Sequence, residues 1–200
     1  IYIPDEGGEL ILDDKPFKPG RPIDAIRRGL TMVPQEISPA ANLTIADNFY
    51  LGREITKGKF FLNQKAMNEQ ASAILKELGV PMDVTEKMSD VSVAKAQLVA
   101  IATAVSNDAK VIIMDEPTTA LTENEVDQLY RIIETVKARG IAIIFISHKL
   151  DEVFRVSDEI TVIRDGQYVD TKPTKEVTKE QLISMMVGRD MSEMFQRERF

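Results

Sequence analysis

Two adjacent carboxylates, Asp115 and Glu116, follow the apolar run 111–114, and Pro117 comes next. A short apolar run of this kind predicts a buried strand. In a parallel sheet the carboxyl ends of the strands line the crevice where ligands bind. There Asp115 could hold Mg²⁺, while Glu116 could polarise a water molecule that attacks a phosphoryl group. The alternative is a strand that simply ends in an acidic turn.

The single histidine, His148, follows a second apolar run, residues 141–146. A lone histidine at the end of a strand is more often structural than catalytic. One predicted helix separates this run from the first, and such a βαβ unit brings the ends of its two strands side by side. This placement beside Asp115 and Glu116 favours a role in the same chemistry.

Two neutral side chains come from other elements. Gln35 follows a predicted strand over residues 30–33 and could contact Mg²⁺ or the attacking water, although these residues alone favour an exposed loop glutamine. Ser92 precedes a helical pattern, where a serine usually serves only as the N-cap. A hydroxyl beside unpaired N–H groups at the start of a helix is also an anion site.

The elements that must position these residues alternate between strands and helices. Apolar spacing predicts helices near residues 22–28, 67–78, 94–105, 126–136, 150–156 and 179–187. Because the strands at 111–114 and 141–146 are apolar throughout, we expect an α/β fold whose parallel sheet is covered on both sides. Antiparallel hairpins are expected near residues 9–15 and at 159–171, where Asp165 and Gly166 form the turn of the second.

The composition limits the function classes. The chain of 200 residues has a net charge of −7, with 44% hydrophobic and 28% charged residues. An acidic balance argues against a nucleic-acid partner, whose backbone favours a basic surface. The absence of cysteine excludes disulfides, thiolate catalysis and cysteine-ligated zinc. No apolar run approaches the ~20 residues of a spanning helix, so we expect a soluble, intracellular globular protein.

Taken in order, these motifs resemble the ATP-binding subunit of ABC transporters. The residues that carry the resemblance are Gln35, the serine-led helix after Ser92, and residues 111–121 and 146–150. A narrower resemblance, to the ribose and galactose importers whose ATPase chain holds two such domains in tandem, rests on residues 120–126, 147–153, 160–166 and 185–189. The last of these is similar to the end of the first ATPase domain. The resemblance implies a P-loop NTPase-like parallel sheet core, a helical sub-domain insertion and a small antiparallel β element.

The resemblance also implies roles for the site residues, with ATP and Mg²⁺ as cofactors. Gln35 corresponds to the Q-loop glutamine, which senses Mg²⁺ and the γ-phosphate. Asp115 corresponds to the Walker B aspartate that holds Mg²⁺, and Glu116 to the catalytic base. His148 corresponds to the switch histidine, which contacts the γ-phosphate. Ser92 heads the signature helix and would reach the ATP of the opposite domain, with residues 119–121 as the D-loop at the dimer seam.

Partners and domain extents follow from the same resemblance. It implies transmembrane permease subunits, a second nucleotide-binding domain packed head to tail, a solute-binding protein contacted indirectly, and a peripheral position at the cytoplasmic face of the inner membrane. We expect one nucleotide-binding domain over residues 1–200. Within it we expect the helical sub-domain at about 42–105, the Walker B and switch-histidine core at 106–177, and a C-terminal helix and tail at 178–200. Residues 49–51 could be apolar anchors for the permease or ordinary core.

The chain departs from the family pattern in two places. The signature Leu-Ser-Gly-Gly-Gln corresponds here to residues 91–95, in which Ala94 and Lys95 replace the second glycine and the glutamine. A Walker A loop, Gly-x4-Gly-Lys-Ser/Thr, is absent. In the family that loop lies just before a segment like residues 1–5. We therefore expect a fragment that binds ATP poorly alone and exposes an apolar sheet edge, which favours aggregation or dimerisation.

Two alternatives stay open. One is a degenerate domain that pairs with an active partner without hydrolysing ATP; the altered signature favours it, whereas Asp115, Glu116 and His148 oppose it. The other is an ABC-type ATPase outside transport, such as a DNA-repair protein. The acidic charge and the importer-like segments count against it.

Overall fold

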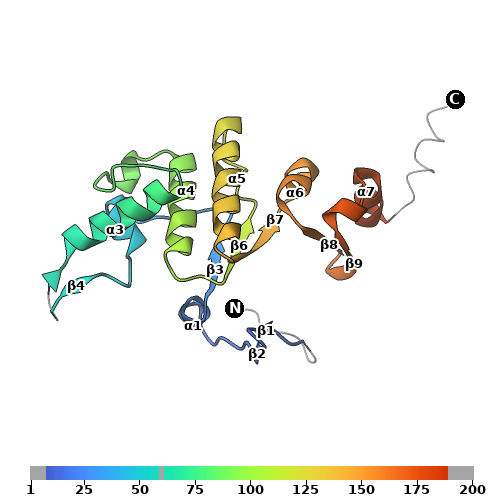
Figure 1. The fold of residues 1–200 in the computed structure, drawn as a ribbon, viewed down its shortest axis with the longest axis horizontal. Helices are drawn as coiled ribbons and strands as arrows, with labels where there is room; N and C mark the ends of the chain where they lie inside the picture. Colours follow the sequence, from blue (N-terminus) through green and yellow to red (C-terminus); the bar gives the residue numbers. More distant parts are fainter. Residues whose placement is uncertain (1–7, 59–60, 189–200) are drawn as a thin grey trace. The chain divides into compact units, whose positions relative to one another are not determined.

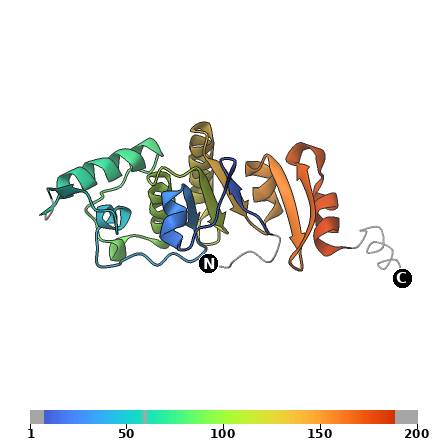
Figure 2. The same cartoon turned by 90° about the horizontal axis from the view of Figure 1, so that it is seen from below.

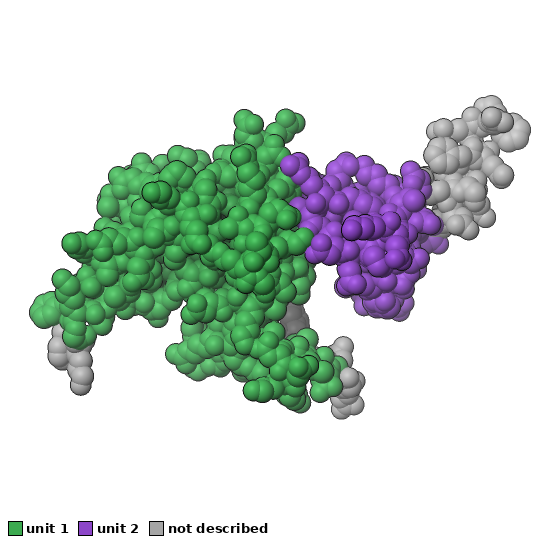
Figure 3. All heavy atoms as spheres, in the orientation of Figure 1, with its two compact units in different colours: residues 1–146 green, residues 147–200 purple. Residues whose placement is uncertain are grey.

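A computed structural model of the chain describes residues 8–58 and 61–188, in two compact units formed by residues 1–146 and 147–200 (Figure 3). In the first unit the helices and strands are β1 (Ile11–Leu12), β2 (Lys15–Pro16), α1 (Pro22–Arg27), β3 (Leu30–Val33), α2 (Ile45–Phe49), β4 (Thr56–Lys57), β5 (Phe61–Leu62), α3 (Gln64–Glu77), α4 (Val93–Val105), β6 (Val111–Asp115), α5 (Glu123–Ala138) and β7 (Ala142–Ile146). The second contains α6 (Leu150–Val156), β8 (Glu159–Arg164), β9 (Gln167–Pro173) and α7 (Lys179–Val187). The domain extents expected from the sequence stay predictions.

A three-stranded parallel sheet forms the centre of the first unit (Figures 1 and 2). Its strand order is β3-β6-β7, so segments far apart in the sequence pair directly. In one row of the register, Met32 lies beside Ile113, which lies beside Ile144. The predicted parallel sheet is therefore confirmed, and the carboxyl ends of all three strands share one edge.

One face of this sheet is buried and the other is not. Val33, Ile112 and Met114 are at most 1% exposed, while α4 adjoins β3 and α5 adjoins β7. On the opposite face, Met32 and Ile144 are 52% and 50% exposed. The expectation that helices cover both faces is wrong for the described residues, because the apolar stripes of α4 and α5 pack against one side.

The segment expected to be helical holds three helices that pack on one another, α2, α3 and α4. Local sequence explains where they begin: Thr44 and Asp47 form a capping box at α2, and Asn63 and Ser92 cap α3 and α4. The antiparallel hairpin of β4 and β5 was not expected within this segment.

The sequence left open whether residues 49–51 are core or apolar anchors for a partner, and the structure divides them. Phe49 is fully buried and Tyr50 is 6% exposed, so both belong to the core of the helical segment. Leu51 is 58% exposed. Of the three, only Leu51 remains a candidate for an apolar contact with a partner.

The second unit is a hairpin packed against two helices. β8 and β9 pair antiparallel around the turn at Asp165 and Gly166, both with positive φ, as the sequence predicted. The small core of this unit consists of Ile160, Val162, Val177 and Leu182, with side chains of α6 and α7 packed against it. Among the described residues of the chain, no helix is both long and apolar enough to cross a bilayer.

Gly29 connects α1 to the sheet under tight geometric limits. Its φ is +90°, and its carbonyl oxygen accepts hydrogen bonds from the backbone N–H groups of Lys110 (2.8 Å) and Val111 (3.0 Å). A Cβ atom at this position would lie 2.9 Å from Cγ and 3.2 Å from the backbone nitrogen of Lys110. The contact holds the amino ends of β3 and β6 together.

We predict that Gly29→Ala lowers the free energy of unfolding by about 1–3 kcal/mol, because alanine meets both a left-handed backbone and a close contact. Gly20→Ala is the matched control, since a Cβ at Gly20 meets nothing within 4 Å and its φ is not left-handed. Urea unfolding followed by circular dichroism measures both. Equal effects of the two substitutions would contradict the geometric account.

Candidate active site

The carboxyl edge of the sheet gathers the predicted site residues of the first unit. Asp115 ends β6 opposite Ile146 of β7. The next backbone N–H, that of Glu116, donates to the Ile146 carbonyl oxygen at 2.9 Å. Gln35 lies two residues beyond β3 on the other side of β6. Strand pairing alone therefore brings these polar groups to one place.

Gln35 and Glu116 are in direct contact although they lie 81 residues apart in the sequence. The amide Nε2 of Gln35 donates to Oε2 of Glu116 at 3.2 Å. The residues around Gln35, taken alone, favoured an exposed glutamine in a loop. The structure keeps it at the surface and ties it to the carboxylate that is the candidate base.

Thr119 is a second donor to Glu116. Its backbone N–H donates to the Glu116 carbonyl oxygen at 3.2 Å, and its hydroxyl lies 3.1 Å from that oxygen and 3.3 Å from Oε2 of the same residue. A hydroxyl has one proton, so it alternates between these acceptors. The sequence placed Thr119 in the D-loop but did not predict this contact. The signal available was a threonine three residues after the acid, which favours local bonds to the backbone.

The backbone at Glu116 is in a conformation that side chains rarely adopt. Its φ is +43°, in the left-handed region that costs a non-glycine residue about 1–3 kcal/mol. The following residues, Pro117 and Thr118, are buried and fix the chain after it. Such outliers cluster at functional sites, where the surrounding structure holds them. The conformation supports a functional role for Glu116, and a plain acidic turn would not require it.

The residues present suit a Mg²⁺–phosphate group. In the part of the chain that the structure describes, the carboxylate of Asp115 accepts no hydrogen bond, so its oxygens are available to a cation. Those same residues contain no cluster of three or more His, Cys, Asp or Glu side chains that could hold a metal by themselves. Mg²⁺ in phosphate sites needs only one or two protein oxygens, since water and phosphate oxygens complete its shell. Asp115 and the amide oxygen of Gln35 fit that requirement.

Ser92 is placed where the sequence predicted, at the N-cap of α4. Its hydroxyl accepts from the backbone N–H of Lys95 at 3.3 Å. Among the described residues no hydrogen bond joins Ser92 to Gln35, Asp115 or Glu116. Capping is thus its observed role, and contact with a phosphate stays a prediction.

Lys95, three positions after Ser92, adds positive charge to the surface at the start of α4. Lys95 is exposed, whereas Ala94 is 6% exposed. Hydrogen bonds from the backbone and hydroxyl of Thr122 lower the pKa of Glu125, and the nearby charge of Lys95 lowers it further. Lys95 therefore lies near the start of α5, which follows the D-loop.

His148 belongs to the second unit and lies between β7 and α6. The residues around it form a local network: the Ser147 hydroxyl accepts from the backbone N–H of Lys149 at 3.0 Å and donates to Glu152 at 3.3 Å. The Lys149 ammonium pairs with Glu152 at 3.1 Å. This network stabilises the start of α6, and a place for His148 beside the γ-phosphate stays a prediction.

The chain matches known proteins along most of its length. A family model described as ABC transporter matches residues 2–119. The ribose/galactose/methyl galactoside import ATP-binding protein of Geobacillus kaustophilus is 43% identical over 198 residues, 98% of this chain and 39% of that protein. The galactose/methyl galactoside import ATP-binding protein MglA 2 of Photobacterium profundum is 43% identical over 195 residues, 98% of this chain and 38% of that protein.

Solved structures share the fold. An ATP-binding cassette of an ABC transporter in its ADP conformation superposes with a TM-score of 0.73 at 22% identity, covering 96% of this chain and 78% of that one. A dimeric cassette in a post-hydrolysis state with ADP and phosphate gives 0.69 at 18% identity, covering 85% and 75%. At these identities the likeness shows the fold alone, and it confirms the P-loop NTPase-like core expected from the sequence.

The chain spans about two fifths of the length of the curated relatives it matches. The family model covers more than half of the chain, including Gln35, Ser92, Asp115 and Glu116. The match, the fold and the polar groups at the carboxyl edge of the sheet agree with one another. This chain belongs to the ABC transporter family.

Proposed function

We propose that the chain is part of the ATP-binding and ATP-hydrolysing subunit of a monosaccharide importer, as the first of two nucleotide-binding domains. The observation that carries the proposal is the contact of Gln35 with Glu116 beside the unpaired carboxylate of Asp115, at the carboxyl edge of a parallel sheet. The names of the relatives, which describe import of ribose, galactose and methyl galactoside, supply the substrate class.

Each residue has a defined task in this proposal. Asp115 and the amide oxygen of Gln35 hold Mg²⁺, which when bound to ATP neutralises charge on the phosphate oxygens. Glu116 accepts the proton of the attacking water, for which its carboxylate must be held in place. His148 contacts the γ-phosphate, and Ser92 binds the nucleotide of the opposite domain.

The proposed partners follow from the family. A second nucleotide-binding domain pairs head to tail with this one, and the dimeric cassettes among the solved structures are a precedent for such pairing. Permease subunits contact the helical segment on the cytoplasmic face of the inner membrane, and a solute-binding protein acts through them. The acidic net charge disfavours a nucleic-acid partner.

A non-hydrolysing pairing domain is the second candidate, and it rests on the altered signature. Ala94 stands where the family signature has its second glycine, so its methyl group could lie where the backbone approaches a phosphate. In the structure Ala94 is buried, whereas Ser92 and Lys95 are exposed. The exposed surface at the start of α4 therefore consists of Ser92, Lys95 and the apolar Val93, which is 63% exposed, while the methyl group of Ala94 is buried. A buried methyl group does not obstruct a phosphate at this surface, which supports hydrolysis over the pairing-only function.

The test is titration calorimetry with ATP and Mg²⁺ on two proteins. One is this chain, and the other is a chimera that carries the upstream strand, loop and helix of the Geobacillus kaustophilus relative ahead of residue 1. The proposal expects the chimera to bind and hydrolyse ATP and the chain alone to bind weakly, because a Walker A loop supplies most phosphate contacts. A chimera that folds but binds no ATP would contradict the proposal.

Glu116→Gln in the chimera is predicted to lower the rate of ATP hydrolysis by about 10²- to 10⁴-fold, the usual contribution of a general base. ATP affinity should change little, because the glutamine amide oxygen still accepts bonds from Gln35 and Thr119. Glu134→Gln, an exposed position on α5, is the matched control and should retain full activity. Similar rates for the two variants would exclude Glu116 as the base.

Thr119→Val is predicted to lower kcat about fivefold, the effect of about 1 kcal/mol from one lost hydrogen bond to the base. KM for ATP should stay unchanged, since Thr119 is assigned no contact with the nucleotide. Thr119→Ser restores the hydroxyl and should recover most of the rate in a steady-state assay of the chimera. A loss in Thr119→Ser as large as the loss in Thr119→Val would contradict the proposed role, because serine keeps the hydroxyl that valine lacks.

The two roles of Ser92 can be separated. Ser92→Ala is predicted to destabilise the chain by about 1 kcal/mol through loss of the N-cap, while Ser92→Asp keeps the cap and the stability. In the chimera Ser92→Asp should still abolish hydrolysis, because its carboxylate repels a phosphate. Urea unfolding and ATPase assays measure the two effects. An active Ser92→Asp variant would leave Ser92 as a cap only.

A further inference from the structure

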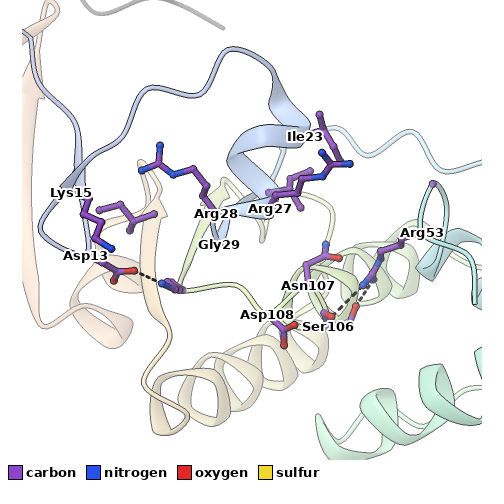
Figure 4. Close-up of a pocket in the computed structure, with 14 residues that line it drawn as sticks. Asp13, Lys15, Ile23, Arg27, Arg28, Gly29, Arg53, Ser106, Asn107 and Asp108 are labelled. Carbon is purple, nitrogen blue, oxygen red and sulfur yellow. Dashed lines mark hydrogen bonds and ion pairs between the residues drawn. The ribbon is translucent and has the colours of Figure 1, made fainter.

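A hollow lined by both polar and apolar side chains lies at the opposite edge of the sheet from the candidate active site (Figure 4). It has a volume of about 710 Å³. Its walls come from the β1–β2 hairpin, α1, Gly29, the segment at Arg53 and the residues between α4 and β6. Gly29 and Lys110 directly precede β3 and β6, whereas Gln35 and Asp115 lie at the other ends of those strands. A strand of five residues spans about 16 Å, so the two sites are separate.

The lining is rich in positive charge although the chain as a whole is acidic. Five basic side chains and two acidic ones line the hollow. Lys110 forms an ion pair with Asp13. Arg53 donates to the carbonyl oxygens of Phe49 (2.7 Å), the last residue of α2, and of Ser106 (3.2 Å), the C-cap of α4. Its charge therefore offsets the negative ends of both helices. Asp108 lies near the charge of Arg53.

The remaining three basic residues, Lys15, Arg27 and Arg28, are all exposed. Within the described part of the chain, the side chains of Lys15 and Arg27 donate no hydrogen bond; Asp24, whose carboxylate feels the charge of Arg27, is bonded by Arg21 at 3.2 Å. Donors in these two side chains are therefore unused.

Arg28 is held in place on one side only. One of its terminal nitrogens donates to the carbonyl oxygen of Pro16 at 2.9 Å, and its guanidinium lies 4.5 Å from the ring centre of Phe17. A guanidinium has five N–H donors in a planar fork. Arg28 thus presents a fixed fork with unused donors, the arrangement that binds phosphate groups in a bidentate manner.

An apolar wall stands beside these charges. Ile23 and Ile26 on α1 and Leu12 on the hairpin line the same hollow, and Ile23 is 42% exposed. The volume lies within the range of about 300–1,000 Å³ that small-molecule sites occupy. A ligand with an anionic group and a compact carbon skeleton would satisfy both parts of the lining, whereas an inorganic anion would satisfy one.

We propose that this hollow binds a small phosphorylated molecule, with its phosphate on the basic side chains of the lining and its carbon skeleton against the apolar wall. The site is separate from the nucleotide site, and the proposal does not depend on the proposed function. A ligand in this hollow contacts α1 and Gly29, which directly precede β3.

The test uses the chain itself with two probes that each carry a phosphate group, inorganic phosphate and phenyl phosphate, at a pH at which both are dianions. Adenine nucleotides are avoided because the candidate active site would also bind them. Calorimetry gives Kd, and the amide signals of Gly29 and Gly52, which line the hollow, report the location in ¹H–¹⁵N NMR spectra. We expect saturable shifts of both signals, and tighter binding of phenyl phosphate because its ring buries apolar surface.

Lys15→Gln with Arg27→Gln should raise Kd for phenyl phosphate by about tenfold or more, since each removed charge takes a charge-assisted hydrogen bond with it. The matched control is Lys65→Gln with Lys76→Gln on α3, which removes the same charge outside the hollow and should leave Kd unchanged. Because Lys15 and Arg27 are exposed, the unfolding midpoint should not move; if it does, Lys15→Gln alone provides the comparison.

Three results would overturn the proposal: no saturable shift of Gly29 and Gly52 with either probe, an equal loss of affinity in the control, or binding that depends on Gln35 and is insensitive to Lys15 and Arg27. The last result would place the anion at the candidate active site. None of these results bears on ATP hydrolysis by the chimera.

Discussion

The parallel pairing of β6 with β3 and β7 is the constraint on which the rest of the molecule depends. Hydrogen bonds between these strands fix Met32, Ile113 and Ile144 in one row, and the same register fixes where each strand ends. Gln35 reaches Glu116 across 81 residues of sequence only because β3 and β6 are neighbours. The contact of Gly29 with Lys110 and Val111 secures the opposite ends of the same two strands. Site geometry is thus a consequence of sheet register.

At Glu116 the fold maintains a conformation that its own backbone disfavours. A φ of +43° costs about 1–3 kcal/mol for a side chain of this kind. The hydrogen bond that the Glu116 N–H donates to Ile146 and the bonds that its carboxylate accepts from Gln35 and Thr119 hold it there. The strained conformation turns the carboxylate toward Gln35 at the edge of the sheet. A carboxylate held by two side-chain donors needs little reorganisation to act as a base, which is the advantage of preorganised sites.

The sequence predicted the helices and strands with strong apolar patterns, and it predicted which polar side chains stand at the ends of strands. Both predictions depend on local pattern. The sequence therefore placed α4, the β8–β9 hairpin, Asp115 and Gln35 correctly. It missed the β4–β5 hairpin, whose two-residue strands carry no periodicity. The Thr119 contact depends on a turn geometry that residue types do not specify. The sequence did not predict the exposed face of the sheet either. Ile144 lies in an apolar run, and such a run predicts burial whether or not a helix covers that face of the strand.

The two edges of one sheet carry opposite chemistry. At the carboxyl edge, Asp115 and Glu116 suit a phosphate that arrives with its cation, since carboxylates alone would repel it. At the amino edge, Lys15, Arg27 and Arg28 suit a phosphate without a cation. The end of α4 would oppose an anion there, because the last carbonyl groups of a helix carry partial negative charge. Arg53 donates to the carbonyl oxygen of Ser106 at the end of α4, and its positive charge offsets this local negative charge.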